Sequence, residues 1–222
     1  MPMTDWDLCA EHPILQGNYF AGVDLSSTED LTSVVFYFPE TGAIVPLFFI
    51  PKFGATAREK RDRVPYLAWE AGGHIELTPG NRVDYACVRR AINEFAAANP
   101  GLQDIGIDPW QSAHLMSDLQ VDGFEVVAFP QGFREFNVPT KEVLKLAAEG
   151  KLAHGGQPVL RYCVSNVNAI TDSQGRIRPS KSKSKSVGRI DGFVALVMAV
   201  GRSLDSDPED ASVYDTEPLF VI

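Results

Sequence analysis

The sequence predicts an α/β domain built on a mixed sheet with helices on both faces. Three observations lead to this fold class. Apolar segments with strand character follow one another from residue 19 to residue 52. Helical and strand-like segments then alternate from residue 84 to residue 151, and an apolar helix closes the chain near residue 203. A run of strands followed by such alternation favours three antiparallel strands that continue into parallel ones.

The first three strands come from a strongly apolar part of the chain. Residues 19–27 (YFAGVDLSS) are typical of a buried strand that ends in turn-forming residues. Residues 32–52 contain two more apolar strands, and residues 39–42 between them have the composition of a hairpin turn. We therefore expect these strands to be antiparallel neighbours.

Two helical segments and a short extended piece follow. Residues 56–73 are charged and helix-prone, but Pro65 interrupts them. Residues 74–82 are expected to form a short extended piece and a turn. Residues 84–101 predict an amphipathic helix, because Asn-Pro-Gly ends a helical apolar pattern. The apolar face of this helix is formed by Val88, Ala91, Ile92 and Phe95.

Strands and helices then alternate. Predicted strands over residues 102–109 and 124–129 flank a helix over residues 112–123, for which Ser112 is the expected N-cap. A further short helix is expected after Thr140.

The C-terminal part is expected to hold one more strand and one more helix. Residues 158–170 are interpreted as a strand or an extended segment. A basic loop over residues 176–189 follows, and the last helix runs from about residue 190 to residue 203.

Composition excludes several classes of protein. The chain has 222 residues, of which 45% are hydrophobic and 22% charged, as in ordinary soluble domains with a substantial core. No apolar run reaches the roughly 18 residues of a membrane span, and the acidic N-terminus does not resemble a secretory signal. Three widely spaced cysteines argue against a disulfide framework or a zinc knuckle and suit a reducing cytoplasm.

A local basic stretch contrasts with the acidic whole. The net charge of −9 counts against nucleic-acid binding when it is averaged over the protein. Residues 176–189 nevertheless form a basic stretch in which serines alternate with lysines. Its basic residues are Arg176, Arg178, Lys181, Lys183, Lys185 and Arg189. Both a solvated loop and a loop that binds phosphates have this composition.

Three aspartates stand at the ends of predicted elements. Asp24 lies within the first apolar strand, Asp108 ends the strand before Pro109, and Asp191 begins the last helix. Each has a local explanation, as a turn residue or as an acid favoured at a helix N-terminus. If the three carboxylates lie close together, they repel one another unless cations neutralise them. Carboxylates without cysteine or histidine partners indicate Mg²⁺ or Mn²⁺ rather than Zn²⁺.

The order of elements resembles the ribonuclease H-like fold. Six stretches also resemble, in order, the nuclease domain of the terminase large subunit of tailed bacteriophages. They are GVDLSSTEDLTS (22–33), ELTPGNRVDY (76–85), IGIDPWQSAHL (105–115), FPQGFREFNVPTKEV (129–143), HGGQPVLRYCVSNV (154–167) and KSKSVGRIDGFVALVMAVGR (183–202). No single stretch is decisive, but six in register across nearly the whole chain are specific.

This resemblance implies a metal-dependent endonuclease that cuts double-stranded, concatemeric viral DNA with two ions of Mg²⁺ or Mn²⁺. Carried over by position, the catalytic and metal-binding acids are Asp24, Asp108 and Asp191. Asp30 is a candidate for an outer-shell role, although a turn or cap explains it equally well.

Other residues of the matching stretches have expected roles. Lys183, Lys185 and Arg189 are candidates for contacts with DNA phosphates. Structural roles are favoured for His154 and Asn166. We expect Trp69 and Trp110 to pack in the core or at its edge.

The resemblance also implies boundaries and partners. We expect a linker or extended segment over residues 1–17, the nuclease domain over residues 18–205 and an acidic tail over residues 206–222. Full-length subunits carry an ATPase domain, and the GxxxxGK[ST] phosphate loop of such a domain is absent here, so we expect a separated, monomeric nuclease domain. The expected partners are double-stranded DNA and, in the full-length protein, the ATPase domain, the small subunit and the portal, in the host bacterial cytoplasm and away from membranes.

Three alternatives remain open from the residues. The first is another nuclease of the same fold, such as a junction resolvase or a transposase-like enzyme. The second is a non-catalytic packaging module that binds the portal or other subunits. The third is a structural cation site without hydrolysis.

Overall fold

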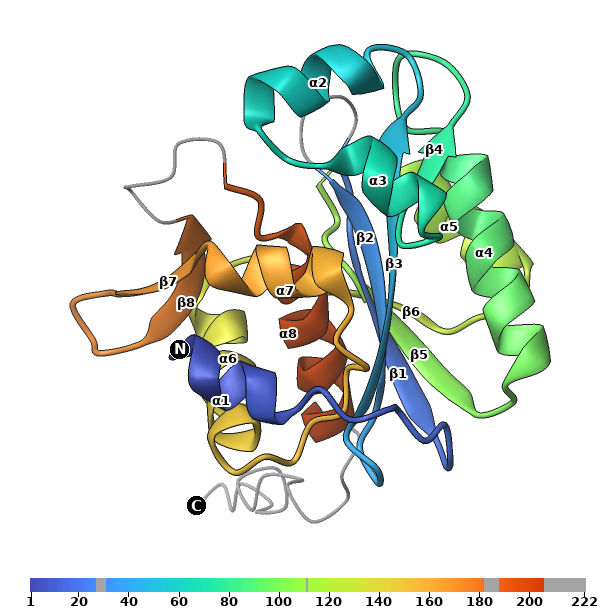
Figure 1. Ribbon diagram of the computed structural model, residues 1–222. Helices are drawn as coiled ribbons and strands as arrows, with labels where there is room; N and C mark the ends of the chain where they lie inside the picture. The colour runs from blue at the N-terminus through green and yellow to red at the C-terminus, as the bar shows by residue number, and fades with distance from the viewer. Residues whose placement is uncertain (27–30, 111, 182–187, 206–222) are drawn as a thin grey trace, which may run out of the picture.

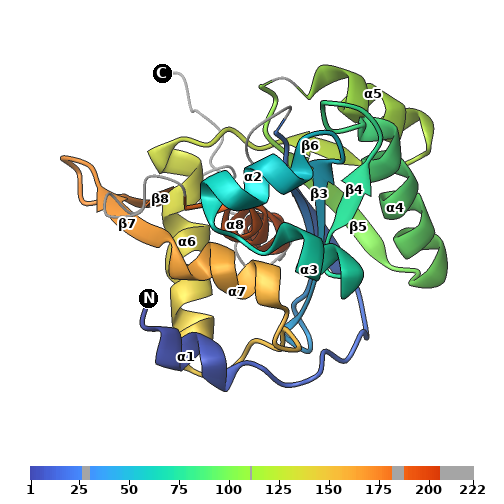
Figure 2. The ribbon, with the colours of Figure 1, turned by 45° about the horizontal axis from the view of Figure 1, so that its top comes forward.

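The computed structural model describes residues 1–26, 31–110, 112–181 and 188–205, and it confirms the predicted mixed α/β class. Helices cover both faces of a six-stranded sheet of order β4-β3-β2-β1-β5-β6, and a two-stranded sheet projects to one side (Figures 1 and 2). The strands are β1 (Tyr19–Asp24), β2 (Thr32–Phe38), β3 (Ala43–Pro51), β4 (Glu76–Thr78), β5 (Leu102–Ile107), β6 (Val126–Ala128), β7 (Val167–Thr171) and β8 (Ile177–Lys181). The helices are α1 (Met3–Leu8), α2 (Ala55–Asp62), α3 (Tyr66–Ala71), α4 (Tyr85–Ala98), α5 (Ala113–Val121), α6 (Phe133–Ala148), α7 (Pro158–Ser165) and α8 (Asp191–Asp205).

The sheet has one edge at which most of its strands end. β2 is antiparallel to both β1 and β3, as the hairpin signal predicted. β5 is parallel to β1, β6 to β5, and β4 to β3. All strands of this sheet except β2 therefore run in one direction. We call the end at which they finish the carboxyl edge.

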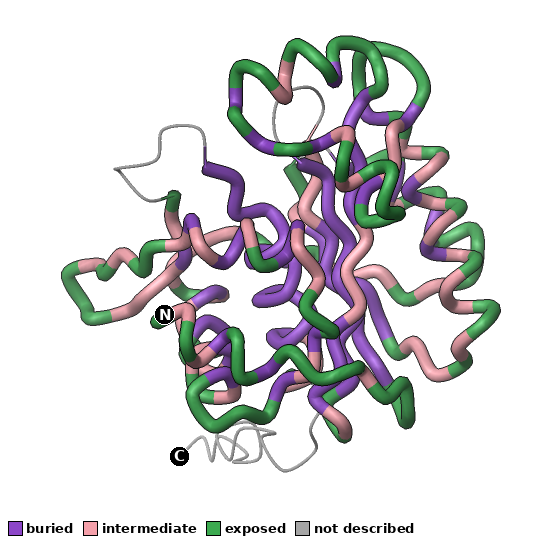
Figure 3. Tube along the Cα trace, in the orientation of Figure 1, coloured by how far each residue is buried: buried purple, intermediate pink, exposed green. Residues whose placement is uncertain are grey.

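Two hydrophobic cores lie on opposite faces of the sheet. Ala21 and Val23 of β1 belong to the core that is covered by α4 and α5. The other core contains α8, which is buried from Asp191 to Gly201 and is enclosed by α6, α7 and α1 (Figure 3). No helix in the described part of the chain has the length and apolar character needed to cross a membrane.

A glycine lets α8 lie directly on the sheet. A Cβ atom built on Gly22 of β1 would stand 2.0 Å from the carbonyl oxygen of Ala195 and 2.7 Å from the amide nitrogen of Ala199. Real Cβ atoms do not approach other atoms so closely, so β1 and α8 can pack at this distance only because residue 22 has no side chain. The position of α8 along the sheet is therefore fixed at Gly22.

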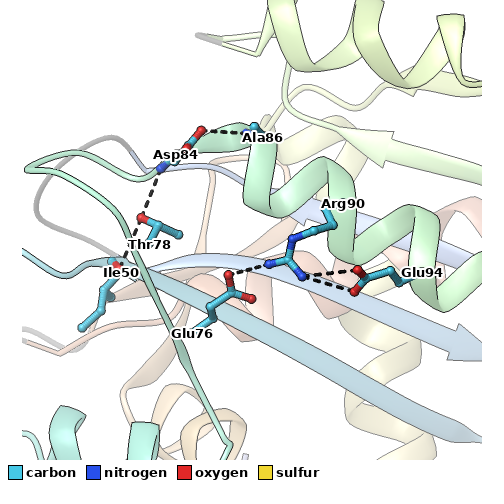
Figure 4. Close-up of polar contacts among 7 residues, drawn as sticks. All are labelled: Ile50, Glu76, Thr78, Asp84, Ala86, Arg90 and Glu94. Atoms are coloured by element: carbon cyan, nitrogen blue, oxygen red, sulfur yellow. Dashed lines mark hydrogen bonds and ion pairs between the residues drawn. The ribbon is translucent and has the colours of Figure 1, made fainter.

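Polar contacts tie the outer strand β4 to α4 (Figure 4). The Thr78 hydroxyl donates to the carbonyl of Ile50 at 3.4 Å and accepts from the amide of Asp84 at 3.1 Å. The Asp84 carboxylate in turn accepts from the amide of Ala86 at 3.0 Å and caps α4. Arg90 of α4 reaches back to Glu76 of β4 at 2.7 Å.

Two predicted boundaries in the second half were wrong. The helix expected after Thr140 begins at Phe133, because its buried stripe runs continuously through Phe136, Pro139, Thr140, Val143 and Ala147. The expected strand over residues 158–170 begins as helix α7. Its buried residues have helical spacing, Pro158 occupies the first turn, and the Gln157 side chain caps the amide of Leu160.

Two further segments differ from expectation. Part of the predicted basic loop forms β8, which pairs antiparallel with β7. At the N-terminus, where a linker or extended segment was expected, residues 3–8 form α1 and Trp6 is fully buried. The Trp6 ring stacks on His154 with ring centroids 4.3 Å apart, which ties the N-terminus to the core. The tail over residues 206–222 lies outside the described residues.

Candidate active site

Asp24 and Asp108 lie side by side at the carboxyl edge. Asp24 is the last residue of β1, and Asp108 directly follows the last residue of β5. These strands are parallel neighbours in which Val23 pairs with Ile107, so the next residue of each strand comes to the same level. The predicted convergence of the two strand acids follows from this register.

Strand alternation directs both acids toward α8. Successive side chains of a strand point to opposite faces. Gly22 faces α8, and so does Gly106 of β5, whose Cβ would stand 2.9 Å from the side chain of Arg202. Asp24 and Asp108 each follow one of these glycines by two residues and therefore belong to the same face.

Asp191 reaches the same end of the sheet from α8. It is the first residue of the helix and is 7% exposed. Ala195, one turn later, packs on Gly22, while Arg202 near the far end of α8 pairs with Asp104 of β5 at 2.8 Å. The helix thus runs opposite to β1 and β5, and its first turn lies near the carboxyl edge (Figures 1 and 2). The helix dipole favours a carboxylate at this position.

The electrostatics of a neighbouring cysteine reflect the same arrangement. Cys163 of α7 is fully buried, and burial raises the pKa of its thiol. The negative charges of Asp191 and, to a lesser degree, Asp24 raise that pKa further. Both carboxylates therefore lie close enough to act on one group. The thiol is held in its neutral form, which is not a metal ligand.

The side chains of the two strand acids have local hydrogen-bond partners. Asp24 accepts from the side-chain amide of Gln131 at 3.0 Å, and Asp108 accepts from the backbone amide of Trp110 at 3.1 Å. Among the residues that the structure describes, no three His, Cys, Asp or Glu side chains are grouped so that they could hold a metal ion. The structure thus places Asp24, Asp108 and Asp191 at one end of the sheet without an assembled coordination sphere.

The chemistry of these donors fits a hard divalent cation. Asp24, Asp108 and Asp191 offer carboxylate oxygens, and Gln131 offers an amide oxygen. Mg²⁺ and Mn²⁺ prefer such oxygen ligands, whereas structural zinc sites are typically built from cysteine and histidine. The two strand acids are half-buried at the edge.

The residues that lead into α8 are held by a buried ion pair. Arg189 donates to Asp62, the last residue of α2, at 2.9 Å, and these side chains are 8% and 0% exposed. Arg61 and the Tyr66 hydroxyl also donate to the Asp62 carboxylate, at 2.6 Å and 3.1 Å. Burial alone would raise the pKa of Asp62, but the hydrogen bonds from Arg61 and Arg189 outweigh it and hold that pKa below its usual value.

Arg189, a candidate for contact with DNA phosphates, is therefore buried in an ion pair within the protein. The sequence shows it as the last cation of a basic run, whereas the structure buries it against an acid 127 residues away. The other two candidates for phosphate contacts, Lys183 and Lys185, lie outside the described residues, and so does Asp30.

His154 and Asn166 have the structural roles that were favoured for them. His154 is buried, donates from Nε2 to the carbonyl of Trp6 at 2.8 Å and accepts at Nδ1 from the amide of Gly156 at 3.1 Å. Burial lowers the pKa of this imidazole. The Asn166 amide donates to the carbonyl of Arg189 at 3.2 Å and so supports the chain before Asp191.

The two tryptophans differ in their placement. Trp69 packs at the edge of the core against Tyr66 and Tyr162, as expected. Trp110 is 78% exposed, so the expectation that it packs in or at the edge of the core was wrong. It follows the carboxyl end of β5, where the chain leaves the sheet before α5 begins.

Sequence reasoning missed two residues of the site region. Gln131 follows β6 at the carboxyl edge and lies within the matching stretch at residues 129–143, so its place after a parallel strand was an available signal. Asp62 carried no such signal, because it is one of several charged residues in a helix-prone segment.

A known protein family matches nearly the whole of this chain. Residues 2–207 match the family model described as terminase large subunit, endonuclease domain. The chain is 33% identical over 216 residues to the terminase large subunit of Enterobacteria phage HK97. This match covers 95% of the present chain and 42% of the HK97 protein. It is 30% identical over 176 residues to protein YmfN of Escherichia coli K12, covering 76% of this chain and 38% of that protein. The chain thus spans about two fifths of the length of these relatives.

Solved structures show the same fold. The crystal structure of the HK97 large terminase superposes with a TM-score of 0.83 at 33% identity, over 91% of this chain and 43% of that one. The large terminase nuclease of the thermophilic phage G20c superposes with a TM-score of 0.59 at 13% identity, over 88% and 95% of the two chains. Structures of that nuclease with bound magnesium, cobalt and zinc give TM-scores of 0.54, 0.53 and 0.52. This chain belongs to the endonuclease-domain family of the terminase large subunits.

Proposed function

We propose that this domain is a metal-dependent endonuclease that cuts double-stranded, concatemeric phage DNA during genome packaging, and that Asp24, Asp108 and Asp191 form its active site. The observation that carries the proposal is the convergence of these acids from β1, β5 and α8 at one end of the sheet. Membership of the terminase endonuclease family supports the reaction class.

The three acids have different tasks in this proposal. Asp24 belongs to a central strand and would contact both of two divalent ions, while Asp108 and Asp191 would each hold one. Such ions, when bound, lower the pKa of an attacking water and stabilise the charge that develops on the leaving 3′ oxygen. Gln131 orients the Asp24 carboxylate through its hydrogen bond, and Asn166 and Asp62 hold the chain that leads into Asp191.

Mg²⁺ or Mn²⁺ is the proposed cofactor. The oxygen-only donor set favours these ions, and burial keeps the nearby Cys163 thiol protonated. Structures of the G20c nuclease with bound magnesium, cobalt and zinc support the use of a divalent ion by similarity of fold. The number of ions, two, rests on the proposed roles of the acids.

The proposed partners follow from the family. Double-stranded DNA is the substrate, with Lys183 and Lys185 as further phosphate contacts from outside the described residues. In a full-length subunit an ATPase domain, the small subunit and the portal would complete the packaging machine in the host cytoplasm. Asp30 is retained only as an outer-shell candidate.

Replacement of Asp191 tests the active site. Asp191→Asn keeps the shape of the side chain and removes its charge, so we expect the fold to persist and cleavage of supercoiled plasmid with Mn²⁺ to fall by about 100-fold or more. The matched control is Asp118→Asn, which removes one charge from an exposed acid of α5. Calorimetric titration with Mn²⁺ should show weaker binding only for Asp191→Asn.

Other results would point to the alternatives. Cleavage by Asp191→Asn at the wild-type rate would remove this residue from the site. Preferential cleavage of branched junctions over linear or plasmid duplex would indicate a resolvase. Mn²⁺ binding without cleavage of any DNA by the wild-type chain would contradict the endonuclease proposal and favour a structural cation site or a non-catalytic module.

A further inference from the structure

A basic segment lies beside the candidate active site. Residues 52–63 connect β3 to the end of α2 and contain five basic and two acidic side chains, a net charge of +3 in a chain of net charge −9. β3 is antiparallel to β2, as β1 is, so this segment leaves the sheet at the carboxyl edge. Figures 1 and 2 show α2 at the end of the molecule where α8 begins.

The acids of this segment are committed to contacts within the protein. Glu59 accepts from the backbone amide of Leu67 at 2.8 Å. Asp62 is buried and pairs with Arg189 at 2.9 Å. Both acidic side chains of α2 are thus engaged within the protein. The contact between Asp62 and Arg189 also ties the end of α2 to the chain two residues before Asp191.

Three basic side chains of the segment face solvent. Lys52, Lys60 and Arg63 are exposed, and within the described residues none of them forms an ion pair. Backbone hydrogen bonds hold the start of the segment against the loop after β4, from Lys52 to Thr78 at 2.8 Å and from Phe53 to Gly80 at 3.0 Å. Lys52 therefore lies on an anchored part of the chain.

The backbone at Arg63 adds an independent observation. Arg63 has a φ of 55° and is the one residue other than glycine with positive φ in the described ranges. It ends α2 in the left-handed conformation, where glycine or asparagine is usual and other residues cost roughly 1–2 kcal/mol. A long cationic side chain at a position that favours glycine indicates that its charge has a function.

The chemistry of the neighbouring site identifies the ligand. Three carboxylates in an acidic protein repel a DNA backbone, so a duplex that approaches them needs local positive charge. Lysine and arginine contacts to phosphates supply such attraction without reading the base sequence. We propose, on the basis of the proposed endonuclease function, that Lys52, Lys60 and Arg63 bind backbone phosphates of duplex DNA at the carboxyl edge.

Equilibrium binding tests this surface separately from cleavage. The triple variant Lys52→Gln, Lys60→Gln, Arg63→Asn removes the charges and places a residue that tolerates the left-handed conformation at position 63. The control Lys141→Gln, Lys145→Gln, Lys151→Gln removes three charges from α6 and the loop after it. Binding of a blunt 30-bp duplex is measured by fluorescence anisotropy with EDTA present, from 50 to 200 mM salt, and circular dichroism verifies folding.

The expected result is a selective loss of affinity. Each lost phosphate contact should weaken binding by up to about 8-fold at 0.1 M salt, and the slope of log K against log salt should become shallower by about 2.7 for three contacts. The control should match the wild-type protein in both quantities.

Two results would overturn the proposal. If the triple variant binds the duplex as the wild-type protein does, these three side chains do not contact DNA phosphates, while the endonuclease proposal stands. An equal loss of affinity in the control variant would show that binding depends on the net charge of the protein and not on these three positions. Failure of the wild-type chain itself to bind duplex DNA would refute the proposed function together with this inference.

Discussion

The contact between β1 and α8 provides the sharpest test of how the fold places the acids. Gly22→Ala adds one methyl group at a point where the nearest atom, the carbonyl oxygen of Ala195, would be 2.0 Å away. Both neighbours of this methyl group, Ala195 and Ala199, contribute backbone atoms, so no side-chain rotation can relieve the overlap. The variant folds only if α8 moves away from the sheet.

The size of this movement follows from the geometry. Ordinary van der Waals contact begins at 3.4 Å, so α8 and β1 must separate by about 1.4 Å at this point. Overpacking of a core typically costs about 1–3 kcal/mol of folding free energy. Asp191 lies one turn before Ala195 and moves with the helix, and a misplacement of about 1 Å can reduce a catalysed rate by roughly 100-fold.

Urea denaturation and plasmid cleavage measure these two effects. Gly132→Ala is the matched control, since its Cβ would meet the carboxylate of Glu135, the far end of a flexible side chain. We expect the urea concentration at the midpoint of unfolding to be lower for Gly22→Ala than for the wild-type protein. Its Mn²⁺-dependent cleavage should drop by about 100-fold, and both quantities should be nearly unchanged in the control. Wild-type stability and cleavage in Gly22→Ala would refute the idea that this contact fixes Asp191.

Two further predictions concern buried titratable groups. Asp62→Asn leaves Arg189 without its buried anion and should lower the free energy of unfolding at pH 7 by about 3–5 kcal/mol in urea denaturation. Because the pKa of Asp62 is lowered in the fold, its contribution to stability is present at neutral pH and is lost as the pH falls below 3.8. The variant should therefore lose less stability than the wild-type protein over that pH range. Burial lowers the pKa of His154 from 6.5, so the unfolded chain takes up the proton more readily and wild-type stability should fall as the pH drops below that value. His154→Gln should flatten this dependence in denaturation curves between pH 7 and 5, and an unchanged slope would show that His154 does not titrate as inferred.

Local patterns account for the parts of the fold that could be predicted. The first three strands and α4 follow from apolar periodicity and turn residues, which depend only on neighbours in sequence. α7 was mistaken for a strand because its apolar residues also alternate in part, although Pro158 at its start indicated a helix. Trp6 of α1 is buried against His154, so its stacking partner lies 148 residues away in the sequence.

The candidate site was predictable only where topology could be inferred. Asp24 and Asp108 end strands that the expected fold makes parallel neighbours, so their convergence needed no side-chain information. The burial of Arg189 depends on an aspartate 127 residues away, and no local signal distinguishes this arginine from the other cations of the basic stretch. The contact of Gln131 with Asp24 depends on strand order, because β6 lies next to β5 rather than elsewhere in the sheet.

The placement of Asp191 depends on both ends of α8. At its start, Arg189 is paired with Asp62, and the amide of Asn166 holds the carbonyl of Arg189. Near its end, Arg202 forms two hydrogen bonds with Asp104 of β5, at 2.9 Å and 2.8 Å.

Between these anchors the helix lies on Gly22 without an intervening side chain. A helix fixed at two ends and in direct backbone contact between them has little freedom to slide along the sheet. Asp191 therefore keeps a fixed position relative to Asp24 and Asp108, although it belongs to a helix and they lie at the ends of strands. This requirement explains why the apolar run after Asp191 is buried so completely, since its packing keeps the carboxylate in place.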